Sequence, residues 1–136
     1  MEIFITAQIS DGISFPYKLN DLEDKMNLFF SDKQYGFSIR KIYSGFVCVS
    51  KVYDEFMVIR PPKLLRKEPA LEFEYKLDFE KYRNIEENER VRYILIEFQR
   101  VLTDILISKK IKDFDVITFL NDLNSFIATQ NLSESS

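Results

Sequence analysis

The sequence predicts an α+β fold: a two-layer sandwich in which three helices cover one face of a mostly antiparallel sheet of about four strands. Three observations support this expectation. Strand-like alternation appears early and in the middle of the chain, helical spacing appears after residue 19 and again after residue 85, and the 136 residues are 46% hydrophobic and 30% charged. The expected order is β-α-β-β-β-α-α within a single domain, residues 1–129, followed by a frayed tail, residues 130–136.

The first two elements follow from the spacing of their apolar residues. Residues 2–9 read EIFITAQI and alternate, which predicts a strand. Residues 20–32 predict a helix, because apolar residues recur at three- and four-residue steps: Leu22, Met26, Phe29 and Phe30. Asn20 is the expected N-cap, with Glu23 three residues further on, as in a capping box.

Two strands are expected next. Residues 37–51 form the first, with Gly45 as a bulge or turn, and residues 56–60 form the second. Pro61 and Pro62 cannot lie within a central ladder, so the second strand ends there or runs along an edge of the sheet.

The last three elements have the clearest patterns. Residues 71–79, LEFEYKLDF, alternate strictly, which indicates one buried and one solvated face and favours an antiparallel sheet. Residues 86–108 carry a continuous apolar stripe, with glutamates at its start and lysines after its end, which predicts a helix. A last helix, capped by Asp113 or Asp115, is expected to run to about Thr129.

The residue inventory excludes several kinds of site. The absence of histidine removes Ser-His-Asp and Cys-His nucleophiles and the common zinc sites. One cysteine, Cys48, makes no internal disulfide, and three separated glycines cannot build a phosphate loop. We therefore expect no enzyme, no catalytic residue, no cofactor and no metal site. The alternating start is unlike a signal peptide, and no apolar run is long enough for a membrane. Because a single cysteine favours a reducing, intracellular setting, we expect a cytoplasmic protein.

Charge is unevenly distributed along the chain. The formal net charge is −3, yet residues 40–67 contain seven basic and two acidic residues. With aromatic residues between the basic ones, this segment is a candidate nucleic-acid surface, in which cations contact phosphates and rings stack on bases. The alternative is a strand edge protected against aggregation by charge and proline.

Four segments carry a resemblance to a known family. They read MEIFITAQI at 1–9, YGFSI at 35–39, EFEYKLDFEKY at 72–82 and IKDFDVITFLNDL at 111–123. In these segments, mostly core and turn residues, the chain resembles one of the small immunity-protein families of bacterial polymorphic toxin and contact-dependent inhibition systems. The resemblance implies a noncatalytic inhibitor that binds a cognate toxin domain and covers its active site or a surface it needs. Residues 52–69 do not share the resemblance.

Two groups of residues are candidates for contacting such a partner. Tyrosines outside the apolar stripes form one group, because interface cores are enriched in tyrosine; half-buried sheet positions are the alternative explanation. The acidic side of strand 71–79 forms the other, because acidic groups would mimic nucleic-acid phosphates toward a toxin that is a basic nuclease; a solvated strand face is the alternative. The predicted contact residues are Tyr35, Tyr43, Tyr53, Glu72, Glu74 and Asp78. The oligomeric state stays open.

Overall fold

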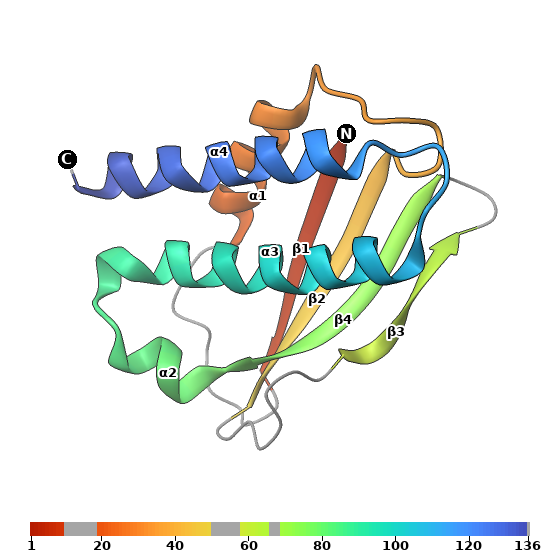
Figure 1. Ribbon diagram of the computed structural model, residues 1–136. Helices are drawn as coiled ribbons and strands as arrows, with labels where there is room; N and C mark the ends of the chain where they lie inside the picture. The colour runs from red at the N-terminus through yellow and green to blue at the C-terminus, as the bar shows by residue number, and fades with distance from the viewer. Residues whose placement is uncertain (10–18, 50–57, 66–68, 136) are drawn as a thin grey trace.

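A four-stranded sheet and a set of helices form two layers in the computed structural model, which describes residues 1–9, 19–49, 58–65 and 69–135 (Figure 1). The strands are β1 (Glu2–Ile9), β2 (Lys41–Val49), β3 (Val58–Leu65) and β4 (Ala70–Asp78). Their order across the sheet is β1-β2-β4-β3, so β4 lies between the two strands that precede it in sequence.

The predicted strand directions are wrong. β1 pairs parallel to β2, and β2 pairs parallel to β4, so three strands are parallel; β3 pairs antiparallel to β4. The prediction inferred antiparallel pairing from the strict alternation of residues 71–79, but alternation shows only that one face of a strand is buried. The chain between β1 and β2 contains a helix, and a crossover of this kind returns the second strand parallel to the first.

Two local features of the sheet bear on the predictions around glycine and proline. β3 is an edge strand that runs through Pro61 and Pro62, with a register shift between Arg60 and Lys63, which agrees with the expectation for these prolines. The bulge or turn expected at Gly45 is wrong, because β2 pairs with both of its neighbours through Gly45 without a break.

The helices are α1 (Leu19–Phe30), α2 (Phe79–Asn84), α3 (Arg90–Lys109) and α4 (Val116–Ser135), with a 3₁₀ turn, η1 (Glu87–Glu89), before α3. Three helices were expected, and α2 is the additional one. Asp78 starts it, because its Oδ1 accepts a hydrogen bond from the backbone N–H of Lys81 at 3.1 Å. α4 includes most of residues 130–136, the expected tail.

The start of α4 confirms one of the two expected caps. The Asp115 carboxylate accepts hydrogen bonds from the backbone N–H of Thr118 at 3.1 Å and from its hydroxyl at 2.7 Å. These bonds lower the pKa of Asp115, because they stabilise the charged carboxylate. No helix in the described part of the chain is long and apolar enough to cross a membrane.

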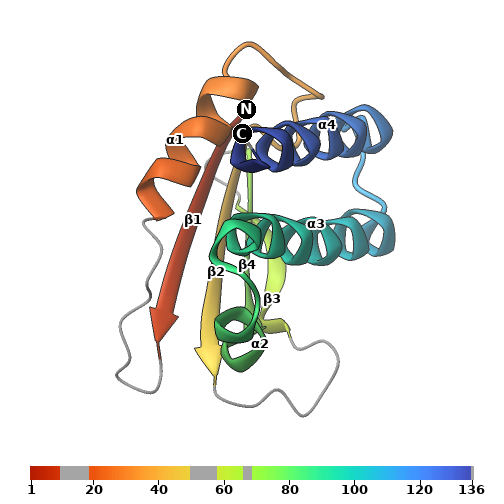
Figure 2. The same cartoon turned by 90° about the vertical axis from the view of Figure 1, so that its left-hand side faces the viewer.

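α1 lies along β1 at one edge of the sheet (Figure 2). Asn27 Oδ1 accepts a hydrogen bond from the backbone N–H of Ile3 at 2.7 Å, and Glu23 Oε2 accepts one from Ile5 at 2.9 Å. In an uncovered edge strand, such N–H groups are unpaired and can bond to a strand of another molecule. Side chains of α1 therefore satisfy and shield the edge of β1.

The core lies between the sheet and the helices. Phe30 at the end of α1 packs against α4, since its ring centroid is 5.7 Å from that of Phe119 and 6.4 Å from that of Phe126. The sheet contributes every second residue of its parallel strands: Ile3, Ile5, Ile42, Phe46, Leu71, Phe73, Tyr75 and Leu77. The alternate residues of the same strands therefore point to the other side of the sheet.

Candidate functional site

The sheet has a second side, opposite to α3 and α4, and it presents residues from three parallel strands (Figure 2). We call this surface the open face; its residues are Phe4, Thr6, Tyr43, Gly45, Glu72 and Glu74. The register aligns them in two rows, Phe4 with Tyr43 and Glu72, and Thr6 with Gly45 and Glu74. The side chain of Thr6 is exposed and those of the aromatic and acidic members are half-buried.

An aromatic pair lies in the first row of the open face. The rings of Phe4 and Tyr43 are stacked, with centroids 5.1 Å apart and an interplanar angle of 13°. Stacked rings hold each other in place and add stabilisation beyond the area they bury. Two aromatic side chains are thus held side by side on the side of the sheet opposite to α3 and α4 (Figure 2).

Gly45 leaves a shallow hollow in the second row. The hollow has a volume of about 170 Å³ and is lined by Phe4, Thr6, Tyr43, Ser44, Gly45, Glu72, Phe73 and Glu74. A Cβ at position 45 would lie 3.0 Å from Thr6 Oγ1 and 3.4 Å from Glu74 Cγ. Because glycine has no side chain, it leaves space on the sheet surface between the aromatic pair and the acidic residues.

The charge of this region is mixed. Glu72 and Glu74 lie on β4, and the register places Lys63 and Arg60 of β3 beside them. Lys76 continues the row on β4. The register therefore places a basic position beside each of the two glutamates, so the acidic row does not continue across the sheet.

The other predicted contact residues lie elsewhere. Tyr35 is buried, at 7% exposure, and its hydroxyl donates a hydrogen bond to Asp122 Oδ2 at 2.7 Å. Burial and then this carboxylate raise the pKa of Tyr35. Asp78 is half-buried and serves as the N-cap of α2, and Tyr53 lies outside the described residues. The structure thus groups Tyr43 with Glu72 and Glu74 and adds Phe4, Thr6 and Gly45, which sequence reasoning missed.

Two of the segments that carry the resemblance meet in space. Gly36 and Phe114 form an isolated antiparallel bridge. Beside it, the Tyr35 carbonyl oxygen accepts a hydrogen bond from the Asp115 N–H at 2.7 Å, and the Asp113 carbonyl oxygen accepts one from the Ser38 N–H at 3.5 Å. The backbone of Gly36 has φ +143°, and a Cβ there would lie 1.9 Å from the Asp113 carbonyl oxygen. Only glycine fits such a conformation and approach. We call this contact between residues 35–38 and 112–115 the loop clamp.

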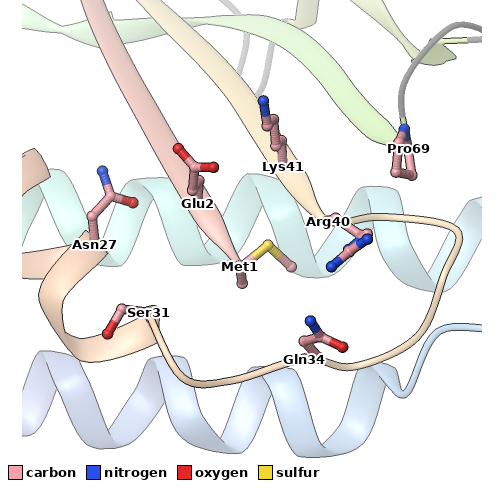
Figure 3. Close-up of a pocket in the computed structure, with 8 residues that line it drawn as sticks. All are labelled: Met1, Glu2, Asn27, Ser31, Gln34, Arg40, Lys41 and Pro69. Atoms are coloured by element: carbon pink, nitrogen blue, oxygen red, sulfur yellow. The ribbon is translucent and has the colours of Figure 1, made fainter.

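A larger hollow lies at the amino-terminal ends of β1 and β2 (Figure 3). Its volume is about 640 Å³ and it is lined by Met1, Glu2, Asn27, Ser31, Gln34, Arg40, Lys41 and Pro69. The register pairs Glu2 with Lys41, so both signs of charge lie at its rim. Within the described residues, no three His, Cys, Asp or Glu side chains converge as metal ligands would.

The basic segment 40–67 is divided by the fold. Arg40 and Lys41 lie at the start of β2, whereas Arg60 and Lys63 lie on β3, on the far side of β4. The register places the latter two beside acidic residues of β4. Among the described residues of the segment, the basic positions therefore do not form the uninterrupted row that a nucleic-acid surface uses; Lys51, Arg66 and Lys67 lie outside the described residues.

Comparison with known proteins gives one match. The family model described as Immunity protein 44 matches residues 1–129. Neither the curated proteins nor the solved structures contain a significant match.

Proposed function

The chain belongs to the immunity protein 44 family, and from this membership we propose that it binds a cognate toxin domain and neutralises it. Binding covers the active site of the toxin or another surface that the toxin needs, so protection requires no chemical step by this chain. We place this action in the cytoplasm, within a polymorphic toxin system of the contact-dependent inhibition kind.

The toxin is proposed to dock on the open face. The stacked pair of Phe4 and Tyr43 is the observation that supports this choice, because large aromatic side chains supply much of the energy of many interfaces. The pair is already ordered in the free protein, so binding loses little side-chain entropy. The hollow above Gly45 gives a partner side chain somewhere to enter beside the rings.

Charge is proposed to orient the toxin on this surface. Glu72 and Glu74 accept hydrogen bonds from cationic side chains of the toxin, as a basic nuclease would offer. Because basic residues of β3 lie beside them in the register, the net attraction is modest and the pattern of both signs fixes the binding mode. A standard interface buries roughly 800 Å² on each partner, so the contact extends beyond the open face.

The experiment is coexpression of this chain with the toxic domain encoded beside it, scored by growth and by copurification. We expect the wild-type chain to restore growth and to copurify with that domain. The double variant Phe4→Ala, Tyr43→Ala is expected to bind at least about tenfold more weakly and to lose protection, because truncation of central aromatic anchors has large effects. Phe37→Ala is the matched control, since this ring is 75% exposed but lies in the loop clamp.

Three outcomes would contradict the proposal. Full protection by the double variant together with failure of Phe37→Ala would move the contact to the loop clamp. If the wild-type chain gives no protection against a neighbouring domain that kills cells, that domain is not the cognate toxin of this chain. Binding of nucleic acid by the chain alone, weakening steeply with salt, would favour the alternative function of segment 40–67.

A further inference from the structure

α3 carries a second unusual surface, on the side facing away from the core. Its exposed or half-buried members are spaced by four, three and four residues: Ile96, Arg100, Thr103 and Ile107. We call this stripe the outer seam. Ile96 is 39% exposed and Ile107 is 64% exposed. At 100° per residue, these four positions lie opposite to the buried stripe of the helix, so they contribute nothing to the core.

The spacing of the outer seam is that of the a and d positions through which helices pair. A helix face turned to water is ordinarily polar, and single exposed apolar residues are common. Here, two of the five large apolar side chains exposed in the described part of the chain lie on one helix at this spacing. Their arrangement, rather than their number, suggests a second helix as the partner.

The charges of the outer seam complement themselves. In an antiparallel pair of α3 helices with a two-fold axis between Val101 and Leu102, Ile96 lies opposite Ile107 of the second copy. Arg100 then lies level with Thr103 of the second copy and one residue along the helix from its Asp104, within reach of a long side chain, and the two-fold axis produces this ion pair twice. Arg100 Nη1 also lies 3.9 Å from Glu97 Oε1 in its own helix.

Two shallow hollows lie along the same helix. One has a volume of about 420 Å³ and is lined by Arg100, Thr103, Asp104 and Ile107. The other has a volume of about 440 Å³ and is lined by Ile96 together with Asn84, Ile85, Glu86, Glu89, Arg92 and Tyr93. The antiparallel arrangement brings an isoleucine of the second copy to each of them, as knobs meet holes in paired helices.

We propose that a second copy of this chain docks antiparallel along the outer seam and forms a two-fold dimer. α3 lies on the opposite side of the sheet from the open face (Figure 2). Both open faces therefore stay accessible in the dimer, and the inference stands whether or not the open face is the surface that a toxin contacts.

Sedimentation velocity of the full chain, over about a hundredfold range of concentration, tests the dimer. We expect the wild-type protein to shift with concentration from 16.2 kDa toward twice that mass. Ile107→Glu and Ile96→Glu are each expected to weaken association by more than about tenfold, because each places a carboxylate in an apolar contact. Ile117→Glu is the matched control, since Ile117 is 74% exposed on α4 and is expected to leave association unchanged.

A charge exchange tests the antiparallel register. Arg100→Asp and Asp104→Arg are each expected to weaken the dimer by about fivefold, and the double variant is expected to restore it, because the same pair is rebuilt with exchanged signs. Circular dichroism confirms folding of each variant. A wild-type protein that stays monomeric at every concentration overturns the proposal, as does equal dissociation by Ile117→Glu and Ile107→Glu. A double variant weaker than both single variants overturns the antiparallel register.

Discussion

Replacing Gly36 with alanine is expected to destabilise the protein strongly, because the loop clamp leaves no room for a side chain. The added Cβ would lie 1.9 Å from the Asp113 carbonyl oxygen and 3.0 Å from Phe114 Cα, and both are backbone atoms. A non-glycine residue at such a φ costs about 1–3 kcal/mol in strain. Separating the two segments also weakens backbone hydrogen bonds worth about 1 kcal/mol each.

The net loss follows from these contributions. Alanine reduces the entropy of the unfolded chain, which offsets about 0.4–1 kcal/mol of the destabilisation. We therefore expect the free energy of unfolding to fall by about 2–4 kcal/mol and the melting temperature by roughly 10 °C. Urea denaturation gives the first quantity and a thermal melt followed by circular dichroism gives the second.

Gly45→Ala is the matched control for Gly36→Ala. Its Cβ would meet the Thr6 and Glu74 side chains at 3.0 and 3.4 Å, and side chains can move where backbone cannot. We expect a change within about 1 kcal/mol for this variant. Equal destabilisation by the two substitutions, or a loss below about 1 kcal/mol for Gly36→Ala, would refute the reasoning, because the backbone of residues 35–38 would then not be held against Asp113.

Three further predictions concern buried or capping hydrogen bonds. Tyr35→Phe is expected to lower the free energy of unfolding by about 1–2 kcal/mol, because it removes the bond to Asp122. The raised pKa of Tyr35 means that its stabilisation of the fold is fully present below the ordinary pKa near 10 and declines as pH rises from there toward the raised pKa of the folded state, so only the wild-type protein should begin to lose that part above about pH 10 in urea titrations. Asn27→Ala is expected to lose about 1–3 kcal/mol and to speed hydrogen exchange at Ile3, whereas Asn27→Asp, which keeps an acceptor, should restore protection. Asp115→Asn should lower the melting temperature at pH 7, and its difference from the wild-type protein should shrink as pH falls below the ordinary carboxyl pKa, because the lowered pKa of Asp115 makes its stabilisation present above that value and lost as the carboxylate of the folded state is protonated.

The sequence pattern predicts which strand residues are buried, but it does not predict strand direction. Strict alternation at residues 71–79 places Leu71 and Phe73 in the core, as observed. The same alternation suits a parallel sheet covered on one side, so it carries no information about pairing. Pairing depends on the crossover through α1 and on the insertion of β4 between β2 and β3, which are contacts between distant segments.

The candidate surface is partly predictable for a similar reason. Tyr43 and Glu72 lie on strands predicted from sequence, and the register brings them together only once the strand order is known. Tyr35, like Tyr43, is a tyrosine outside the apolar stripes, but it is buried and bonded to Asp122, and only the tertiary structure reveals this. For Phe4, the sequence does contain a local indication of an exposed aromatic residue, because it lies on the otherwise polar side of residues 2–9.

The alternation of the three parallel strands separates two kinds of sequence information. Ile42 and Leu71 are buried in the core, while their chain neighbours Tyr43 and Glu72 lie on the open face, where we propose that the toxin docks. Substitutions at every second position can therefore change the preferred partner and leave the packed interior intact. If the toxin changes, a few point mutations on the open face can restore binding while the fold stays the same. Gly45 is the exception, because the lack of a side chain there shapes both the sheet and the hollow on the open face.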